Sequence, residues 1–410
     1  MDLRLFKQPV VAAAYALNVG FRARRGVTGR KRHDGDARKI VHACIADCWD
    51  GTHYRASPGH FRQFWTRDLS FSAPALARIS PQHRERVIAS AQWAIRTWRH
   101  RNSHITTTIH FFDQPVDVFD YGVDCLPLLM AALHRIGADE VLAEHRSWFE
   151  VEVRHYLDQV VDPATGMVRD DRKYSAHRDT VVNRCNAFGN SMVALLAMTL
   201  VDLGWDLPDA IAPLAMAPQR ILLDHFWDAR GFFIDAPGDD VPSGEGNIWP
   251  FWTGVVTDPS VLRQAFGTLE EHGFANPYPL KYEPVRRPEI EPWFVRTFLP
   301  DYQGSTVWTS LGSMYLQLLN SIQPEVARPE IDRYVDWIER DGTFWEVIDD
   351  ETGQRWSSSI LTRSDESMLW SAIFLDLLEH PDAPPASLRP WPAAAAPYEV
   401  GPASSSASSR

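Results

Sequence analysis

Apolar residues recur at three- and four-residue spacing through most of the first 380 residues, which is the pattern of amphipathic helices. The pattern predicts about twelve helices. Their expected ranges are Val10–Phe21, Ala37–Asp50, Phe71–Ile79, Gln82–His100, Leu126–Ile136, Asp139–Val161, Asn186–Leu203, Pro208–Trp227, Ser260–His272, Thr306–Ile322, Pro329–Arg340 and Glu366–Leu378. Strand-like runs are short and bounded by turns, at Ile105–Phe112, Gly231–Ile234 and Thr343–Ile348.

The predicted helices come in pairs. Within some pairs the connection is short, as at Ile136–Asp139 and Leu203–Pro208, whereas the loops between pairs are long and rich in Asp, Glu, Trp, Tyr and His. Short loops at one end and long polar loops at the other are typical of a ring of antiparallel helix pairs. We therefore expect an all-α fold, an (α/α)6 toroid with a few short strands in its loops, and we expect functional residues on the long loops.

Residues 381–410 are dominated by Pro, Ala and Ser, so we expect one domain over residues 1–380 followed by a disordered tail. The net charge of −12 argues against nucleic acid or an anionic membrane as a partner. The apolar run near residues 9–21 is too short to span a bilayer. The four cysteines form no CxxC pair and fit a reducing compartment, so we expect a cytoplasmic protein. No metal-ligand cluster is evident, so we expect no cofactor; the oligomeric state is left open.

Two carboxylates stand at predicted helix starts beside aromatic residues. Arg67 and Asp68 follow Phe64 and Trp65, and this group can form a polar floor that binds sugar hydroxyls. Asp124 precedes an apolar helix, where burial could keep a carboxyl group protonated as a general acid. Both aspartates are equally consistent with simple helix N-caps.

Three further loops carry candidate residues. The triplet His177, Arg178 and Asp179 can bind hydroxyl groups, or it can be a polar network that orders its loop. Glu346 lies between apolar residues in a strand-like run, where a carboxylate is costly unless it has a partner or a function. It is the strongest candidate for a general base. Two carboxylates in an aromatic pocket match the chemistry of glycoside cleavage.

Five segments in order resemble the six-hairpin (α/α)6 glycosidases. These are FWTRD (64–68), YGVDCLPLLMAAL (121–133), IWPFWTG (248–254), YQGSTVWTSLGSMYLQLL (302–319) and FWEVIDDETGQRW (344–356). The resemblance is to the branch that holds glycoside hydrolase family 63 enzymes and glucosylglycerate or mannosylglycerate hydrolases, together with glycogen-debranching-type glucosidases and alkaline/neutral invertases. Relatives commonly have Ser or Ala after the acid, where this chain has Cys125.

The resemblance implies an inverting glycoside hydrolase with Asp124 as general acid and Glu346 as general base. Because the chain lacks the large insertions of glycogen-processing relatives, the resemblance implies a small carbohydrate substrate, an α-linked glucoside or a related glycoside. The residues expected to bind it are Phe64, Trp65, Arg67, Asp68, Tyr121, His177, Arg178, Asp179, Trp249, Trp252, Tyr302, Gly304, Trp308 and Trp345.

Two other functions fit a toroid of this kind. A sugar 2-epimerase would use paired histidines as acid and base, and here His177 is the only histidine inside a convincing constellation. A toroid that binds carbohydrate without catalysis is the second alternative.

Overall fold

The structure is a computed structural model that describes residues 20, 31–118, 121–172, 174–179, 181, 185–235, 241–359 and 363–390. The helix expected over Val10–Phe21 therefore lies outside the described residues except for Gly20. Within the described part of the chain, no helix is both long and apolar enough to cross a bilayer.

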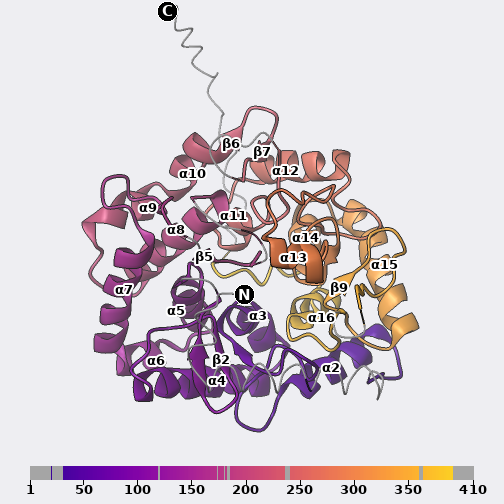
Figure 1. Cartoon of the computed structure of the whole chain (residues 1–410), viewed down its shortest axis with the longest axis horizontal. Helices are drawn as coiled ribbons and strands as arrows, with labels where there is room; N and C mark the ends of the chain where they lie inside the picture. The colour runs from indigo at the N-terminus through magenta and orange to yellow at the C-terminus, as the bar shows by residue number, and fades with distance from the viewer. Residues whose placement is uncertain are drawn as a thin grey trace, which may run out of the picture.

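Six helices form a closed inner ring (Figure 1). In chain order they are α3 (Thr66–Ile79), α5 (Cys125–Arg135), α8 (Ala187–Asp202), α11 (Trp249–Trp252), α14 (Thr309–Ile322) and α16 (Ser371–Glu379). Each packs against the next, and α16 packs against α3, which closes the ring. The inner helices are apolar on nearly every side; in α8, 13 of the 16 residues are buried. A helix that is hydrophobic all round is one that is covered all round.

A second set of helices surrounds the inner ring. These are α2 (Ala37–Cys48), α4 (Pro81–His100), α7 (Arg146–Val160), α10 (Pro218–Phe226), α12 (Pro259–Glu271) and α15 (Pro324–Asp341). They are amphipathic: in α4 the buried residues include Val87, Ala91, Ala94 and Trp98, which share one face at helical spacing. The all-α toroid expected from the sequence is confirmed.

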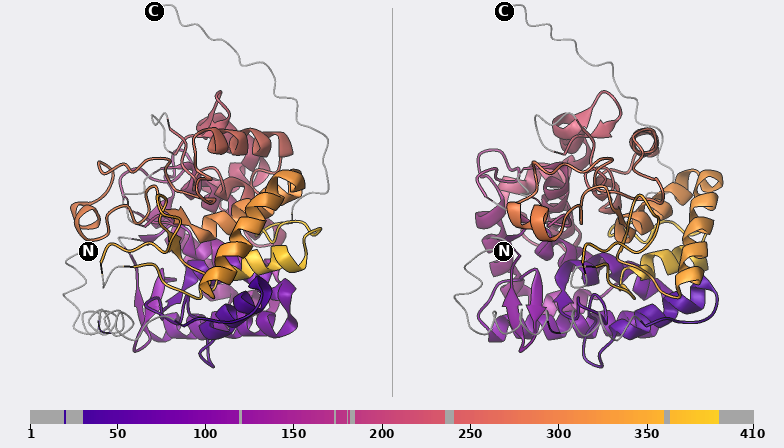
Figure 2. Two further views of the ribbon diagram at one scale, coloured as in Figure 1. Left: turned by 90° about the vertical axis from the view of Figure 1, so that its right-hand side faces the viewer. Right: turned by 45° about the vertical axis from the view of Figure 1, so that its right-hand side comes forward.

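Short elements fill the connections. The helical ones are α6 (Asp139–Glu144), the 3-10 turn η2 (Asp209–Ile211), α9 (Ala212–Met216) and α13 (Trp293–Phe298). The strands are β1 (Phe64–Trp65), β2 (Thr108–His110), β3 (Gln114–Val116), β4 (Tyr121–Gly122), β5 (Tyr174–Ser175), β6 (Trp227–Asp228), β7 (Phe232–Phe233), β8 (Val307–Trp308) and β9 (Val347–Ile348). Figure 2 shows the long orange segment between α12 and α14 protruding on one face of the ring.

Two strand pairs join loops that are distant in sequence. Strand β4 pairs in parallel with β5, and Tyr121 lies opposite Tyr174. Strand β8 pairs antiparallel with β9, and Trp308 lies opposite Val347. These pairs fix the loops that lead into α5, α8, α14 and α16, and so they position the residues at the starts of the inner helices.

Several helix boundaries differ from the expected ones for local reasons. Helix α3 begins at Thr66, so Arg67 and Asp68 lie in its first turn and Asp68 is not its N-cap. The helix expected at 139–161 is divided at His145 into α6 and α7. Helix α15 starts at Pro324 and continues through Pro329. Helix α16 starts at Ser371, because residues 366–370 form a loop in which Ser367 has φ of 56°.

The tail expected to be disordered from residue 381 begins with a packed segment. Ala386 and Leu388 are buried, the Ala386 N–H donates to Gln317 Oε1 at 2.7 Å, and the Leu388 N–H donates to the Trp252 carbonyl at 3.1 Å. Residues 381–390 are therefore part of the domain, and residues 391–410 lie outside the described residues.

Gly312 provides a test of how closely α14 and α15 pack. A Cβ at this position would collide with the Tyr334 hydroxyl and the Pro279 carbonyl, which are hydrogen-bonded to each other. Gly312→Ala should therefore destabilise the fold by about 1–3 kcal/mol. At Gly267 in α12 a Cβ would meet nothing within 4 Å, so Gly267→Ala should be neutral or stabilising by up to about 1 kcal/mol. Urea unfolding of both variants measures the difference; equal stabilities would contradict the packing described here.

Candidate active site

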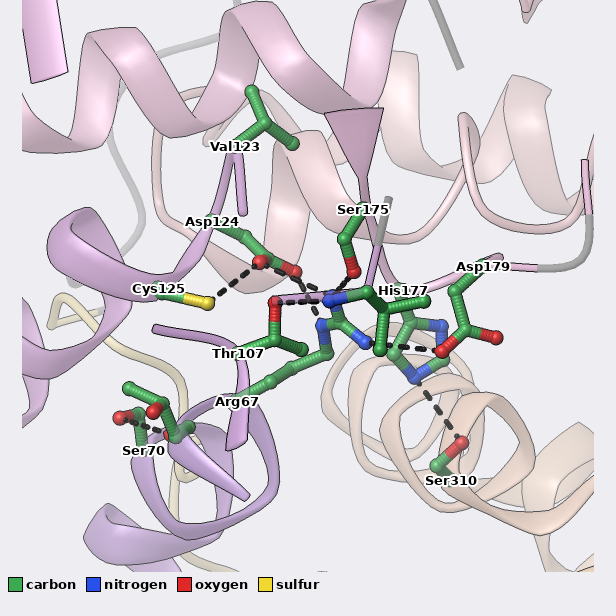
Figure 3. Close-up of polar contacts among 12 residues, drawn as sticks. Arg67, Ser70, Thr107, Val123, Asp124, Cys125, Ser175, His177, Asp179 and Ser310 are labelled. Atoms are coloured by element: carbon green, nitrogen blue, oxygen red, sulfur yellow. Dashed lines mark hydrogen bonds and ion pairs between the residues drawn. The ribbon is translucent and has the colours of Figure 1, made fainter. Parts of the chain in front are cut away.

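The starts of the inner helices carry a connected group of polar side chains. Arg67, in the first turn of α3, is its centre (Figure 3). The guanidinium donates from Nε and Nη2 to the two carboxylate oxygens of Asp124, and Nη2 also donates to Ser175 Oγ at 3.1 Å. Arg67 Nη1 lies 3.9 Å from Asp179 Oδ2 on the other side. One arginine thus joins the loops that precede α5 and α8.

Asp124 is fully buried and its carboxylate is saturated by donors. Besides the two Arg67 nitrogens, Cys125 Sγ lies 3.4 Å from its Oδ1. Asp124 occupies the N-cap position of α5, but its side chain makes no capping hydrogen bond. Burial alone would lower the pKa of Arg67, yet that pKa is raised because Asp124 lies against it. The pair is therefore an internal ion pair between α3 and α5.

Asp179 and Asp68 have different surroundings from Asp124. Burial raises the pKa of Asp179 to about 6, with Arg67 opposing the shift and Asp124 adding to it. Burial raises the pKa of Asp68 to about 7, again opposed by Arg67, and Asp179 contributes repulsion. The Asp179 side chain is 19% exposed, whereas Asp68 is 7% exposed as a residue. The pKa values of two aspartates beside one arginine are thus raised toward neutral pH, that of Asp68 more than that of Asp179.

The raised pKa of Asp68 predicts a pH-dependent stability. Between the ordinary pKa of aspartate, 3.8, and about 7, native Asp68 holds a proton that the unfolded chain has released. The native state then binds more protons, so stability falls as pH rises through this window. Asp68→Asn should flatten the decrease in melting temperature between pH 4 and pH 7, whereas Asp171→Asn, at an exposed aspartate whose pKa is lowered, should not. An unchanged slope in Asp68→Asn would show that Asp68 is ionised in the native state.

His177 is held in a neutral, fully hydrogen-bonded state. Its Nδ1 lies 2.6 Å from the Tyr282 hydroxyl, and its Nε2 lies 3.3 Å from Ser310 Oγ. Burial lowers its pKa well below the ordinary value, and Arg67 lowers it further. Its ring also contacts Trp249 edge-to-face at 5.3 Å. The histidine therefore supports the loop before α8 and has no free nitrogen for proton transfer.

Arg178 also has its groups committed to protein partners. Its Nη1 donates to Glu283 at 2.5 Å, and its Nε donates to the Gln303 carbonyl at 2.9 Å. The guanidinium lies over the Tyr282 ring, 5.5 Å from the centroid. Arg178 thus clamps the loop before α8 to the long segment between α12 and α14, as expected if this triplet forms a polar network that orders its loop.

Glu346 is buried at the start of β9 and is bound by two donors. The Tyr302 hydroxyl donates to Oε1, and the Asp365 N–H donates to Oε2 at 2.9 Å. His60 Nε2 lies 4.0 Å from Oε2. Trp308 fixes the tyrosine, because its Nε1 donates to the Tyr302 carbonyl at 2.7 Å and the two rings meet edge-to-face at 5.2 Å.

Neighbouring residues connect Glu346 to Asp179. Tyr302 donates to Glu346, and a polar interaction with the next residue, Gln303, lowers the pKa of Asp179, although burial raises it overall. Gln303 Nε2 also donates to the His177 carbonyl at 3.1 Å. Gly304 completes this turn, where a Cβ would collide with Asp301. One short segment before β8 therefore binds Glu346 directly and binds the backbone of the loop that carries Asp179.

Five of the expected sugar-binding aromatics have packing roles instead. Trp345 donates to Asp341 and has Arg355 over its ring, so neither its N–H nor that face is open to a ligand. Phe64 packs against Trp93 and Trp98 of α4. The others are Tyr121, stacked on His104, Trp249, enclosed by Phe71, His177 and Phe188, and the fully buried Trp252. Trp65 is half-buried and meets Phe61 at 5.5 Å.

Three residues of this site were not identified from the sequence. Gln303, His60 and Asp365 each contact or approach one of the two carboxyl groups. Gln303 directly follows a predicted site tyrosine, which is a usable signal, but Asp365 lies in a loop with no motif. Among the described residues, no three His, Cys, Asp or Glu side chains are grouped as metal ligands.

Solved structures of glycosidases share this fold. A GH63 mannosylglycerate hydrolase from Thermus thermophilus, in complex with Tris and D-glycerate, is 15% identical with a TM-score of 0.58, and the match covers 84% of this chain and 100% of that chain. A wild-type glycosidase and a glycosidase variant in complex with glucose are each 16% identical with a TM-score of 0.55, covering 84% of this chain and 96% of theirs. No family model matches the sequence. No curated protein matches it at a significant level. The structural likeness confirms the (α/α)6 toroid fold.

Proposed function

We propose that the chain is a glycoside hydrolase that cleaves a small α-linked glycoside with inversion at the anomeric carbon. The observation that carries the proposal is the short segment Tyr302–Gln303: the Tyr302 hydroxyl donates to Glu346, and Gln303 Nε2 donates to the carbonyl of His177, two residues before Asp179. These contacts bring into one site a carboxyl group whose pKa is raised to about 6 and a second, buried carboxylate. Glycoside hydrolysis needs such a pair, one to donate a proton and one to accept it.

We assign the general acid to Asp179 in place of Asp124, the acid expected from the family resemblance. Asp124 accepts from Arg67 through both carboxylate oxygens, so its two oxygens are engaged in an internal ion pair rather than directed at a leaving group. Asp179 is the more exposed of the two, and its pKa of about 6 leaves a useful protonated fraction near neutrality. Asp68, neutral up to about pH 7, is then able to donate to a sugar hydroxyl.

Glu346 remains the proposed general base. Its Oε1 accepts from the Tyr302 hydroxyl and its Oε2 accepts from the Asp365 N–H, and these hydrogen bonds hold the carboxylate in a fixed orientation. In the reaction Asp179 gives its proton to the glycosidic oxygen as the bond from that oxygen to C1 breaks. Glu346 takes a proton from the attacking water as the new bond to C1 forms, and the product has the opposite anomeric configuration.

The epimerase alternative has less support. It needs histidines as proton carriers, and both ring nitrogens of His177 are occupied by Tyr282 and Ser310. We therefore place hydrolysis first and treat a non-catalytic toroid as the outcome that an inactive wild-type protein would indicate.

The test is a panel of substrates followed by proton NMR. The panel holds α-D-glucosyl fluoride, α-D-mannosyl fluoride, glucosylglycerate, mannosylglycerate and sucrose. We expect at least one of them to release a β-sugar as the first product. Release of the α-anomer would contradict inversion, interconversion of free sugars would indicate an epimerase, and binding without turnover would indicate the non-catalytic alternative.

A further inference from the structure

A histidine and an aspartate lie behind the proposed base. His60, 9% exposed, is located in the loop before β1, and Asp365 is located in the loop before α16. His60 Nε2 lies 4.0 Å from Glu346 Oε2, and His60 Nδ1 lies 3.6 Å from Asp365 Oδ2. The Asp365 N–H donates to the same glutamate oxygen at 2.9 Å. The imidazole thus lies between two buried carboxylates.

Asp365 is held as an anion by its own loop contacts. The Ser57 hydroxyl and the backbone N–H groups of His60, at 2.7 Å, and Phe61, at 3.1 Å, donate to Oδ2. The Glu366 N–H donates to Oδ1 at 3.0 Å. Burial alone would raise the pKa of Asp365, but it is lowered because His60 and these donors outweigh burial.

Gly59 permits this close approach. A Cβ at residue 59 would collide with the Asp365 carboxylate, so the loop that carries His60 can lie against Asp365 only with glycine there. The position of the imidazole is thereby fixed by backbone contacts from its own loop as well as by its charge.

We propose that His60 and Asp365 are positioning residues that keep Glu346 ionised and oriented as the base of the hydrolysis proposed above, on which this inference rests. Asp365 stabilises the imidazolium form of His60, and the imidazolium attracts the Glu346 carboxylate. Three neighbouring groups are neutral: the Tyr302 hydroxyl, which donates to Glu346, the Ser57 hydroxyl, which donates to Asp365, and Cys48 of α2, a thiol whose pKa is raised well above its ordinary value by burial. His60 therefore supplies the positive charge among these residues.

The test is the pH dependence of kcat/KM for His60→Gln with α-D-glucosyl fluoride or α-D-mannosyl fluoride. Fluoride leaves with little protonation, so the acidic limb of the profile reports the base. Loss of the cation should shift this limb upward by about one pH unit. His42→Gln, at an exposed histidine paired with Glu379, is the matched control and should leave the limb unchanged. If the acidic limb of His60→Gln lies at the same pH as that of the wild type, or at a lower pH, the inference is overturned.

A second variant separates electrostatics from folding damage. In the His60→Gln background, Asp365→Asn removes a carboxylate that now repels Glu346, so the limb should move back down. Thermal unfolding midpoints identify any variant that is unfolded. If His60→Gln is unfolded, His60→Asn takes its place in the experiment. A limb that does not respond to Asp365→Asn overturns the coupling between the two residues. If the wild type hydrolyses neither fluoride, the proposed function itself fails, and this inference fails with it.

Discussion

Replacing Asp179 by asparagine should lower kcat/KM for a natural glycoside by roughly 10²–10⁴-fold, the usual contribution of a positioned general acid. The asparagine keeps the size of the side chain, but it has no acidic proton to give to the glycosidic oxygen. The loss should depend on the leaving group: a glycosyl fluoride, which departs with little help, should be hydrolysed at close to the wild-type rate. Stopped assays with both substrate types measure the contrast.

Two controls make this result specific. Asp171→Asn changes an exposed aspartate paired with Arg169 in the same connection and should leave both rates unchanged. Asp124→Asn removes the carboxylate that accepts directly from Arg67 and leaves Asp179, 3.9 Å away, as the remaining carboxyl partner; breaking a buried pair costs up to about 3–5 kcal/mol, so its main effect should be on stability. Two results together would assign the general acid to Asp124 instead. Asp124→Asn would have to be stable and lose activity on the natural glycoside but not on the fluoride, and Asp179→Asn would have to be fully active.

The pH profile gives an independent check on the acid. A general acid must be protonated, so with the natural glycoside kcat/KM should fall as pH rises through the pKa of Asp179, about 6. The same alkaline limb should be absent with the fluoride, since the proton is not needed there. If kcat/KM fell at the same alkaline pH for both substrates, the titrating group would be one other than the general acid.

Replacing Glu346 by glutamine should abolish hydrolysis of natural glycosides and fluorides alike. The base acts on water whatever the leaving group, so a loss of roughly 10²–10⁴-fold is expected for both substrate types. The glutamine keeps one oxygen for the Tyr302 hydroxyl, so the fold should be retained. Hydrolysis rates of the variant test the loss of activity, and its melting temperature tests the retention of the fold.

Azide distinguishes loss of the base from general damage. It attacks C1 without needing to lose a proton, so added azide should restore turnover of an α-glycosyl fluoride by Glu346→Gln and yield the β-glycosyl azide with release of fluoride. Glu351→Gln, at an exposed residue in the turn after β9, is the matched control and should resemble the wild type. Wild-type fluoride hydrolysis by Glu346→Gln would remove this residue from the mechanism.

Apolar periodicity predicted most of the helices, and the alternation of short and long loops predicted the toroid. The four-residue inner helix α11 was not predicted, because it is too short to show a helical period. The positions of Arg67, Asp68, Asp179 and Tyr302 in one connected site followed from their places in loops before predicted helices. The sequence did not show which aspartate Arg67 pairs with, because both Asp124 and Asp179 are far from it along the chain and only the strand pair β4–β5 brings their loops together. A motif at a helix start therefore located the acids without separating the ion-paired one from the protonated one.

The aromatic residues show a second limit of the sequence. Trp249, Trp252 and Trp345 resemble a sugar platform in composition, yet each is enclosed by the domain. Indole rings serve equally well as core and as binding surface, and only tertiary contacts, such as Asp341 and Arg355 on Trp345, decide between them. Similarly, the burial of Leu388 against Trp252 could not be predicted from a segment rich in Pro, Ala and Ser.

The closure of the ring between α16 and α3 has a consequence for biosynthesis. Helices α2 and α3 find their partner α16 only after some three hundred further residues have been made. Until then one side of each early helix is uncovered, and Asp365 cannot reach the loop that holds His60. A nascent chain stopped before α16 would thus expose apolar surface that chaperones recognise, and the ring would close only when the last helix has been made.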